Sequence, residues 1–347
     1  MKSIEEAEII EGTIVMVRVD WNEPLDRFGA NPKDVRVLDT SRIEASAETI
    51  NFILNKGGKV IVVSHLGDGT DSLEPVVEEA RKIFKERNIH FIKDPWNQSS
   101  SDGKFAFDRL KSGEIAVFEN LRFWMEKEND EGFGNQLAAF ADIYVNDAFS
   151  VSHRRHTSVI QLPKFLPHFA GFRFLEEYKK LSEVFDPEHP FLIILGGAKF
   201  ETKLPLVEKF LEVADDIFIG GAMAKHASDL PIASNSKIIF PAQNYEDLDA
   251  NGDTLSLLAP KIKEAKFIVW NGPLGNYENG YKEGTLSLAK MLADSDAKVI
   301  VGGGDTENAI DELGEDVESK FYFVSLAGGA MLDFLAEGTL PGIEALK

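Results

Sequence analysis

The sequence lacks several features that mark particular classes of protein. It contains no cysteine, which excludes disulfides and thiolate metal sites and leaves the redox compartment undetermined. No apolar run approaches the length of about 18 residues that suggests a membrane-spanning helix. Residues 1–6 have neither the basic flank nor the apolar stretch of a signal peptide. We therefore expect a soluble protein, with the cytoplasm as the default location.

Positive charge is also scarce. The chain holds 37 Lys and Arg against 58 Asp and Glu, a net charge of −21. Proteins that bind nucleic acids or anionic membranes usually have a basic face, so we expect neither partner. All eleven arginines lie between Arg18 and Arg173, which leaves the second half with none. Because arginine binds phosphate and carboxylate through two parallel hydrogen bonds, the first half is expected to hold a small anion. The alternative is chance combined with a surface that prefers lysine.

What the sequence does contain is a regular alternation of apolar, β-branched runs with amphipathic helical runs. Strands are predicted at residues 13–21, 59–66, 115–119, 143–146, 191–195, 216–219, 237–240, 267–270, 298–301 and 321–324. Helices are predicted between them, for example at residues 42–55, 74–86, 203–213 and 285–293. This alternation predicts an α/β fold made of doubly wound, Rossmann-like parallel sheets with helices on both faces.

A length of 347 residues exceeds what one hydrophobic core usually organises, so two domains are expected. We place the first domain at residues 1–170 and the second at residues 187–335. Residues 171–186 are predicted to form a linking hinge helix, after which Pro187 and Pro190 punctuate the chain. The tail, residues 336–347, is expected to pack back on the first domain.

Polar or glycine-rich residues follow nearly every predicted strand. In parallel α/β sheets, ligands bind outside the carboxyl ends of the strands. One such stretch, residues 302–306, reads Gly-Gly-Gly-Asp-Thr and opens a helical run that ends at Leu313. Glycines let the backbone approach a ligand, the helix start attracts an anion, and a carboxylate beside a phosphate suits Mg²⁺. A nucleotide-phosphate site is therefore one reading of this stretch, and a tight structural bend is the other.

Eight motifs in a fixed order decide between these readings. They are Arg-Val-Asp-Trp-Asn-Glu-Pro (18–24), Ser-His-Leu-Gly (64–67), Glu-Asn-Leu-Arg-Phe (119–123), Val-Asn-Asp-Ala-Phe (145–149), His-Arg-Arg-His (153–156), Gly-Gly-Ala-Lys (196–199), Trp-Asn-Gly-Pro (270–273) and Gly-Gly-Gly-Asp-Thr (302–306). Over essentially the whole chain this order resembles phosphoglycerate kinase. The resemblance implies a phosphotransferase that reversibly moves a phosphoryl group between 1,3-bisphosphoglycerate and ADP, giving 3-phosphoglycerate and ATP, with Mg²⁺. It also implies that the first domain binds the glycerate and the second the nucleotide.

The resemblance assigns roles in the first domain. Asp20 and Asn22 match the family positions that hold the hydroxyl and carboxylate end of the glycerate. Arg42 matches the arginine that reaches the transferred group. The ligands of the substrate phosphate correspond to His65, Arg122 and Arg154. Taken alone, Asp20 would be an ordinary turn residue, Arg42 a surface arginine and His65 a structural histidine.

In the second domain, Lys199 and Lys203 are four residues apart and so are expected one above the other on the first turn of a helix. The resemblance makes them the lysines that contact the nucleotide phosphates and the transferred group. It makes Glu278 the carboxylate that binds the ribose and Asp305 the acid linked to Mg²⁺. The remaining nucleotide-binding residues, which cradle phosphate, are Gly303, Gly304 and Thr306.

This chemistry requires no general base, because a carboxylate with a reference pKa of about 4 is already ionised at neutral pH. The catalyst must mainly position two anions and neutralise charge on the migrating group. Arginines, lysines, Mg²⁺ and helix starts are the expected tools. The sequence has no Ser-His-Asp order, no His-x-x-x-His spacing and no Gly-x-x-x-x-Gly-Lys-Ser/Thr loop, which disfavours the generic alternatives.

Some positions depart from the family pattern. Asp68 follows Ser-His-Leu-Gly where the family has an arginine, and the nearby Arg155 is a candidate to compensate. The late motif Ser-Thr-Gly-Gly-Gly-Ala-Ser is replaced by Ser-Leu-Ala-Gly-Gly-Ala-Met at residues 325–331, and Ser150 and Ala222 replace glycines. The function expected is an active, monomeric glycolytic or gluconeogenic kinase. The alternatives are a weakened relative that binds a nucleotide or a phosphorylated acid as a sensor or scaffold, and a kinase for another small carboxylate.

Overall fold

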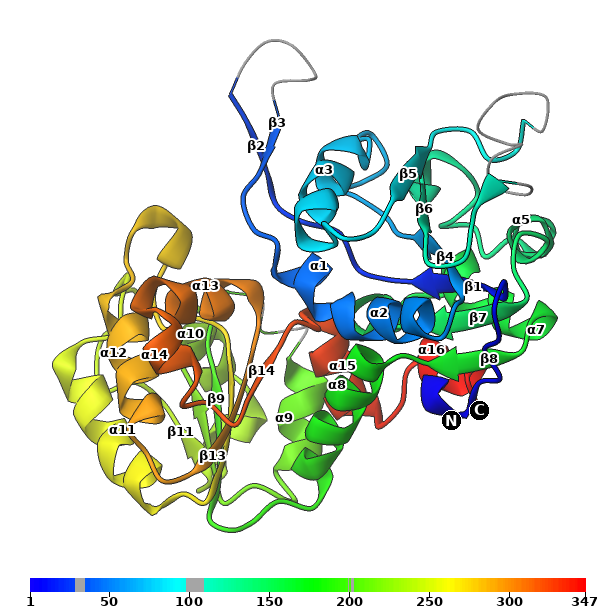
Figure 1. The fold of residues 1–347 in the computed structure, drawn as a ribbon. Coiled ribbons are helices and arrows are strands. Elements are labelled where there is room, and N and C mark those ends of the chain that lie inside the picture. Colours follow the sequence, from blue (N-terminus) through cyan, green and yellow to red (C-terminus); the bar gives the residue numbers. More distant parts are fainter. Residues whose placement is uncertain (29–34, 98–108, 199, 201–202) are drawn as a thin grey trace. The chain divides into compact units, whose positions relative to one another are not determined.

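The structure is a computed structural model that describes residues 1–28, 35–97, 109–198, 200 and 203–347. The chain forms two compact units (Figure 1). Unit 1 comprises Met1–Tyr178 together with Thr339–Lys347, and unit 2 comprises Lys179–Gly338.

The core of unit 1 is a parallel sheet with the strand order β5-β6-β4-β1-β7-β8. Its strands are β1 (Ile14–Arg18), β4 (Lys59–Val63), β5 (Ile89–Ile92), β6 (Ile115–Phe118), β7 (Ile143–Asn146) and β8 (His168–Ala170). A separate antiparallel pair joins β2 (Leu25–Arg27) to β3 (Val35–Val37). Successive side chains of a strand point to opposite faces of its sheet. Val15 and Val17 on one face of β1 and Met16 on the other are all fully buried, so both faces of this strand are covered.

Helices cover the sheet of unit 1 and bury its apolar faces. They are α1 (Ser41–Ala45), α2 (Ala47–Asn55), α3 (Glu74–Ile83), α5 (Glu131–Ala138), α6 (Thr157–Ile160), α7 (Leu162–Phe165), α16 (Pro341–Ala345) and the first part of α8 (Phe172–Ser182), a helix that continues past Tyr178 into unit 2. Ile50 and Ile53 of α2 and Val76 of α3 join the core formed with β1 and β4. The tail helix α16 packs on α6, and the Gly342 amide donates to the Ser152 carbonyl at 2.8 Å.

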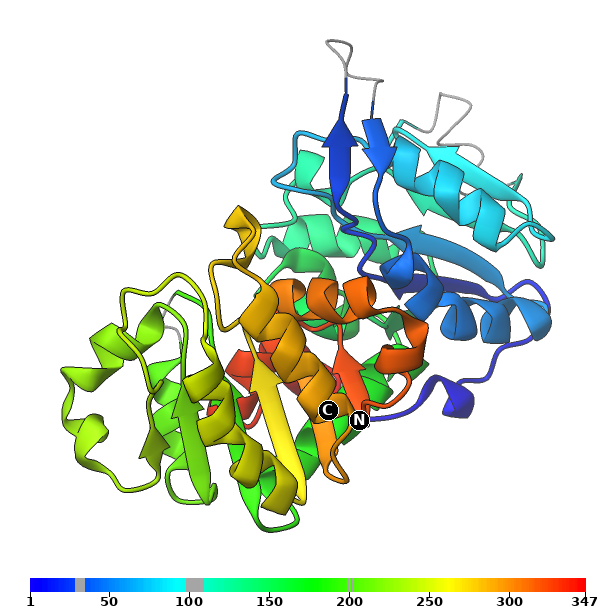
Figure 2. The same cartoon turned by 90° about the vertical axis from the view of Figure 1, so that its left-hand side faces the viewer.

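Unit 2 repeats this architecture around a second parallel sheet, with the order β11-β10-β9-β12-β13-β14. Its strands are β9 (Phe191–Leu195), β10 (Asp216–Ile219), β11 (Ile238–Ile239), β12 (Phe267–Asn271), β13 (Lys298–Gly302) and β14 (Phe323–Ser325). The helices are α9 (Leu204–Phe210), α10 (Met223–Ser228), α11 (Gly252–Glu264), α12 (Glu283–Ala293), α13 (Gly304–Leu313), α14 (Glu315–Glu318) and α15 (Gly329–Glu337). The strand arrows of this sheet point the same way, as parallel pairing requires (Figures 1 and 2).

The predicted α/β class with two parallel sheets is confirmed, and the differences are local. The helix predicted at residues 42–55 is interrupted at Ser46, whose hydroxyl donates to the Ile43 carbonyl at 2.7 Å. The strand predicted at residues 237–240 is only Ile238–Ile239. The short strands β2, β3, β5 and β8 were not predicted, because runs of three or four residues give little periodicity.

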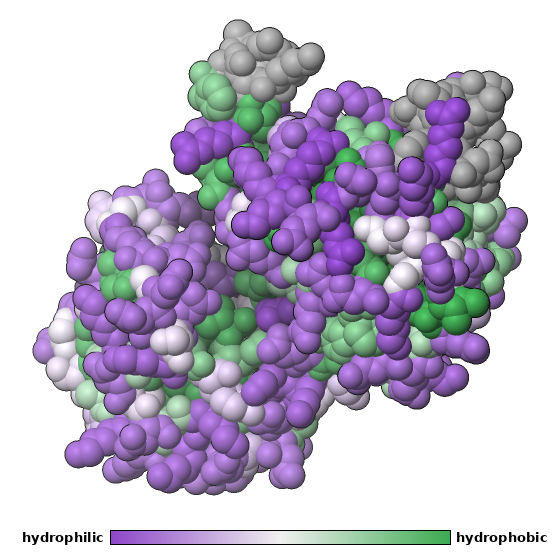
Figure 3. Space-filling model, viewed as in Figure 1, coloured by the Kyte–Doolittle hydropathy of each residue, from purple (hydrophilic) through white to green (hydrophobic). Residues whose placement is uncertain are grey.

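Within the described part of the chain, no helix is long and apolar enough to cross a membrane. Figure 3 shows that hydrophilic residues dominate the face in view and that hydrophobic ones are scattered over it.

Candidate active site

The candidate residues of unit 1 follow the carboxyl ends of its central strands. Asp20 follows β1 and His65 follows β4, while Arg122 lies in the short helix after β6 and Ser150 in the short helix after β7. These strands are neighbours in the sheet, in the order β6-β4-β1-β7. Parallel pairing brings their carboxyl ends to one edge, so residues far apart in sequence meet there.

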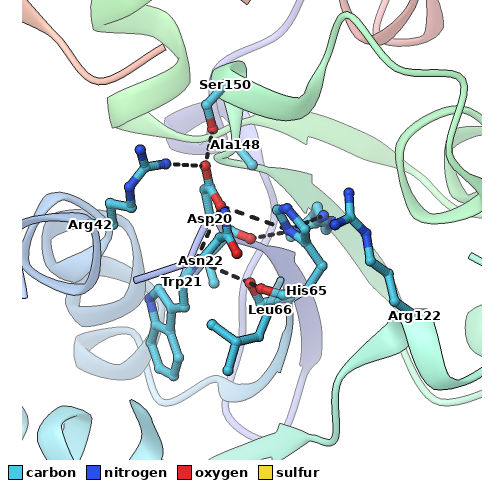
Figure 4. A network of polar contacts seen from close by, with 12 residues as sticks. Asp20, Trp21, Asn22, Arg42, His65, Leu66, Arg122, Ala148 and Ser150 are labelled. Carbon is cyan, nitrogen blue, oxygen red and sulfur yellow. Dashed lines mark hydrogen bonds and ion pairs between the residues drawn. The ribbon is translucent and has the colours of Figure 1, made fainter. Parts of the chain in front are cut away.

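Asp20 is the centre of the contacts at this edge (Figure 4). Its Oδ2 atom accepts hydrogen bonds from the Arg42 guanidinium, at 2.6 Å, and from the Ser150 hydroxyl. Its Oδ1 atom lies 3.7 Å from His65 Nδ1. Burial would raise the pKa of this carboxyl, but the charges of Arg42 and the other neighbouring cations hold it well below its usual range. Asp20 is therefore ionised at any physiological pH.

His65 is neutral, and its tautomer follows from its neighbours. Burial, together with the charges of Arg18 and Arg122, holds the pKa of this imidazole well below its usual range, although Asp20 acts in the opposite direction. The buried Arg18 guanidinium lies 3.2 Å from His65 Nδ1. Because arginine only donates, Nδ1 must accept, and the ring proton is on Nε2. The Nε2–H group is thus left as the donor for a ligand.

A group of cations surrounds this histidine. Burial, then the charges of Arg154 and Arg18, lower the pKa of Arg122, so the positive charges are crowded. Arg154 is exposed, and its Nε donates to His153 Nε2 at 3.2 Å. Arg18 is fully buried and lies 3.8 Å from Glu126, which is also fully buried. A small anion with several charges would relieve this crowding.

Asn22 and Arg122 hold the loop that follows β4. The Gly67 amide donates to Asn22 Oδ1 at 2.7 Å, and the Gly67 carbonyl accepts from the Arg122 guanidinium. Asp68 is the next residue, and its backbone carbonyl accepts from Lys127 Nζ at 2.9 Å. Asp68 therefore lies in a loop whose backbone carbonyls are hydrogen bonded to two cationic side chains, Arg122 and Lys127.

In unit 2, the glycine-rich turns after β9, β12 and β13 line a cavity of about 890 Å³. Lys203, Glu278 and Asp305 also line it. The turns approach each other closely: a Cβ atom on Gly272 would lie 2.5 Å from the Gly196 carbonyl oxygen, and the φ of Gly272 is +94°. Only glycine fits at this position. A cavity of this size is in the range of sites for small ligands.

The ammonium group of Lys203 lies at the carboxyl ends of β9 and β12. Its Nζ atom donates to the carbonyls of Gly196, at 2.6 Å, and of Asn271, at 3.2 Å. Burial lowers the pKa of this lysine to about 8, and the charge of Asp305 opposes the shift. A buried ammonium group beside two glycine turns is suited to bind a phosphate. The negative charge of the phosphate would stabilise the charged lysine in place of the water that burial removes.

The start of α13 supplies the other groups that face this cavity. Burial and the charge of Glu278 raise the pKa of Asp305, while Lys203 acts against them. The Thr306 hydroxyl accepts the Gly272 amide at 2.9 Å and thereby braces the turn after β12. Gly303, with a φ of +106°, begins the helix without a side-chain cap. The lining of this cavity thus carries two carboxylates, Glu278 and Asp305, and the ammonium group of Lys203. It therefore offers charge partners both for a polyanion and for a cation bound to it.

The predicted lysine pair is described only in part. Lys199 lies outside the described residues. Lys203 does not lie within the first turn of a helix, because α9 begins at Leu204 and Lys203 is its N-cap residue. Pro205 near the start of this helix explains the later beginning, since proline has no amide to donate and favours the first turn.

Comparison with known proteins identifies the family. The family model described as phosphoglycerate kinase matches residues 4–230 and 226–338. The chain belongs to the phosphoglycerate kinase family. A phosphoglycerate kinase of Coprothermobacter proteolyticus is 35% identical over 401 aligned residues, covering 100% of this chain and 98% of that protein. One from Moorella thermoacetica is 34% identical and covers 96% of this chain and 95% of its own length.

Solved structures of phosphoglycerate kinases have the same fold. The enzyme of Pyrococcus horikoshii superposes with a TM-score of 0.87 at 25% identity, covering 100% of this chain and 98% of that one. The enzyme of Coxiella burnetii gives a TM-score of 0.81 at 26% identity, covering 99% and 98%. This chain of 347 residues aligns over 401 positions with the first relative, so it lacks segments that this relative has.

The departures from the phosphoglycerate kinase pattern can now be located. Ser150, in place of a glycine, donates directly to Asp20. Ala222 lines the cavity of unit 2 beside Lys225, whose ammonium lies 2.6 Å from Glu246 Oε1. The late motif, residues 325–331, runs into α15, and Gly328, with a φ of +53°, is the N-cap residue of this helix. The start of α15 is therefore kept although its sequence has changed.

Three residues near these sites were not predicted. Arg18 stands inside the Arg-Val-Asp motif and could have been noticed there. Lys127 has no motif, and only the fold brings it to the loop of Asp68. Glu23 is buried beside Asp20, although sequence alone would place a glutamate on the surface.

Proposed function

We propose that this member of the phosphoglycerate kinase family transfers a phosphoryl group between ATP and the carboxylate of 3-phosphoglycerate, giving ADP and 1,3-bisphosphoglycerate, in both directions. The observation that carries the proposal is the crowding of Arg18, Arg122 and Arg154 around a neutral His65 in unit 1. A small, highly charged acid would offset the part of this positive charge that Asp20, Asp68 and Glu126 do not balance.

In unit 1 the proposed ligand is 3-phosphoglycerate. Its phosphate would bind Arg122, Arg154 and the Nε2–H group of His65. Its hydroxyl and carboxylate end would bind Asp20 and Asn22. Arg42, which pairs with Asp20 at 2.6 Å, would turn toward the transferred group. Bidentate guanidinium groups suit both phosphate and carboxylate.

In unit 2 the proposed ligand is ATP or ADP with Mg²⁺. Glu278 would bind the ribose hydroxyls, and Gly303, Gly304 and Thr306 would contact phosphate. Lys203 and Lys199 would hold the transferred group. Asp305 would hold the metal ion together with the phosphates, because its carboxylate oxygens are the hard ligands that Mg²⁺ prefers, and a bound cation would offset the burial and the charge of Glu278 that raise its pKa. When bound, Mg²⁺ neutralises phosphate charge.

The residues would work by positioning and charge neutralisation. The acceptor carboxylate is already ionised, so no residue has to remove a proton from it. Arg42 and the two lysines would stabilise charge on the migrating group while the carboxylate oxygen is held in line with it. We further propose that the protein acts as a cytoplasmic monomer with these small molecules as its partners.

The test is ADP formation from ATP and Mg²⁺ with and without 3-phosphoglycerate. We expect turnover only with the acid. In Lys203→Ala we expect kcat to fall about a hundredfold or more, because the substitution removes a positive charge that would stabilise the transferred group. Lys209→Ala is the matched control: it changes a lysine of α9 that lies 4.7 Å from the Phe185 ring. It should keep its turnover.

Two results would contradict the proposal. Turnover that is equal with and without the acid would indicate an ATPase. ATP binding without any turnover would indicate a relative that keeps the fold for binding alone.

A further inference from the structure

Glu23 is a buried acid with a specific contact to the helix that carries Arg42. Its side chain is 3% exposed. Its Oε1 atom accepts two backbone hydrogen bonds, from the amides of Arg42 and Ile43, each at 3.1 Å. These amides belong to the first turn of α1 and would otherwise lack partners within the helix.

The usual capping residue does not perform this task. Thr40 is the N-cap residue of α1, yet its side chain makes no capping hydrogen bond and its hydroxyl donates to Glu44 Oε1 at 2.8 Å. The Ser41 amide donates to Asp39 Oδ1 at 2.9 Å. The amides of Arg42 and Ile43 thus depend on a glutamate from the segment after β1, about twenty residues earlier in the chain.

The same segment also holds the other end of Arg42. Asp20, three residues before Glu23, accepts a hydrogen bond from the Arg42 guanidinium at 2.6 Å. The backbone of Arg42 is therefore fixed by Glu23 and its side chain by Asp20. The backbone attachment sets the point from which the guanidinium reaches when it leaves Asp20.

We propose that Glu23 is a positioning residue for phosphoryl transfer: by accepting the amides of Arg42 and Ile43, it sets the position from which the Arg42 guanidinium reaches the transferred group. The inference rests on the proposed function. The competing explanation is a purely structural acid that stabilises α1 without affecting the reaction.

The charge state of Glu23 determines which substitution preserves its action. The charged groups that face it are Asp39, Arg42 and Asp20. Burial, then the charge of Asp39, raises the pKa of Glu23 to about 8, against the effects of the Ile43 amide and Arg42. At neutral pH the residue is therefore mostly a neutral carboxyl that accepts through its carbonyl oxygen. Glutamine offers the same acceptor with nearly the same shape.

The experiment compares Glu23→Gln and Glu23→Leu with the wild-type protein. In Glu23→Leu we expect kcat to fall about tenfold to a hundredfold, because a small displacement of a reacting group is costly. Its KM for ATP should be unchanged, since the nucleotide residues lie in unit 2. Glu23→Gln should restore kcat to within about threefold of wild type. Thr40→Ala is the control, which should leave kcat unchanged because this side chain caps nothing.

Amide hydrogen exchange provides a readout that does not depend on activity. The amides of Arg42 and Ile43 should lose protection in Glu23→Leu and keep it in Glu23→Gln. Unchanged kcat in a folded Glu23→Leu protein would overturn the inference, and so would unchanged protection of the two amides. If the wild-type protein itself shows no turnover, the proposed function fails, while exchange still decides whether Glu23 holds this turn.

Discussion

At the scale of single residues, the neighbours of a side chain decide its chemistry. Asp20, which is partly buried, and Glu23, which is buried, are acids in one short segment, yet their pKa values move in opposite directions. Asp20 lies against Arg42 and other cations, which stabilise its carboxylate. Glu23 has Asp39 nearby and a buried Oε2 atom that has no hydrogen-bond partner in the described part of the chain. Identical chemical groups thus serve as a fixed charge and as a neutral acceptor.

Asp68 allows a direct test of charge at the substrate site. Its negative charge acts on Arg122, a proposed phosphate ligand. We predict that Asp68→Arg lowers the KM for 3-phosphoglycerate about tenfold, equivalent to about 1.4 kcal/mol, because an acid is replaced by a phosphate ligand. Asp68→Asn, which only removes the charge, should have an intermediate effect. An equal or higher KM in Asp68→Arg would show that this loop does not face the phosphate.

The sequence indicated that residues from separate motifs would meet at the carboxyl ends of the strands, while their roles stay predictions. Asp20, Arg42 and His65 do lie together. The acceptor role of Glu23 could not be predicted, because it depends on a contact between two segments that only the folded chain brings together. The tautomer of His65 could not be predicted from the sequence either, because it is set by the contact with the buried Arg18.

At the scale of secondary-structure elements, acids that follow the strands of unit 1 hydrogen bond to the starts of helices. Glu23 accepts from α1, and Glu119 accepts from the Leu73 amide at the start of α3 at 2.8 Å. Asp147, after β7, accepts from the Phe174 amide in the first turn of α8 at 3.2 Å. These acids connect strand ends to helix starts that can lie far away in the sequence, since α3 precedes Glu119 in the chain.

The start of α8 gives a prediction at this scale. A Cβ atom on Gly171 would lie 2.2 Å from Asp147 Oδ1, so alanine cannot fit unless the carboxyl moves away from the Phe174 amide. We predict that Gly171→Ala lowers the free energy of unfolding by about 2–4 kcal/mol, as measured by urea denaturation. The control Gly252→Ala has no atom within 4 Å of the added carbon and lies at the start of α11. Equal stability of the two variants would contradict this account.

The strands of the two sheets were easier to predict than the other elements. Runs of three to five large apolar residues, mostly β-branched or aromatic, mark β7, β9 and β10, whose bounds match the prediction. The break between α1 and α2 was missed, because the apolar spacing continues through Ser46. Such breaks depend on tertiary contacts, here the Ser46 hydroxyl that accepts from the Trp21 indole at 3.0 Å.

At the scale of the whole molecule, the charge is unevenly distributed along the chain. Residues 1–175 have a net charge of −6 and residues 176–347 a net charge of −15. Three arginines of unit 1, Arg18, Arg122 and Arg154, nevertheless act on His65, so a negative protein still gathers positive charge at this place. The sequence indicated this through the placement of its arginines, but it could not show which of them meet.

Buried acids also set the pH dependence of stability. The pKa of Glu23 is raised to about 8 and that of Asp147 to about 7, in both cases mainly by burial. In the unfolded chain both acids lose their protons near pH 4, whereas the folded protein retains them. At these two acids the folded state therefore binds more protons between these values, so their contribution to the free energy of unfolding falls as the pH rises from about 4.5 to 8, whereas the lowered pKa of His65 contributes the opposite slope below about pH 6.5.

We predict that Glu23→Gln removes part of this decline. The variant should match the wild type in stability near pH 4.5 and become progressively more stable than it toward pH 8. Each unit of pKa difference corresponds to about 1.4 kcal/mol, so an increase of a few kcal/mol is the upper limit. Urea titrations across this range measure the effect, with the exposed Glu48→Gln as control. Parallel pH profiles for wild type and Glu23→Gln would refute it.

The central claim is that the phosphoryl group goes to a carboxylate. The most direct measurement incubates the protein with ATP, Mg²⁺ and 3-phosphoglycerate in the presence of hydroxylamine, which converts an acyl phosphate into a stable hydroxamate. We predict one hydroxamate for each ADP formed, and neither product without the acid. ADP without hydroxamate would show that the phosphoryl group reaches water or another acceptor, and would contradict the account.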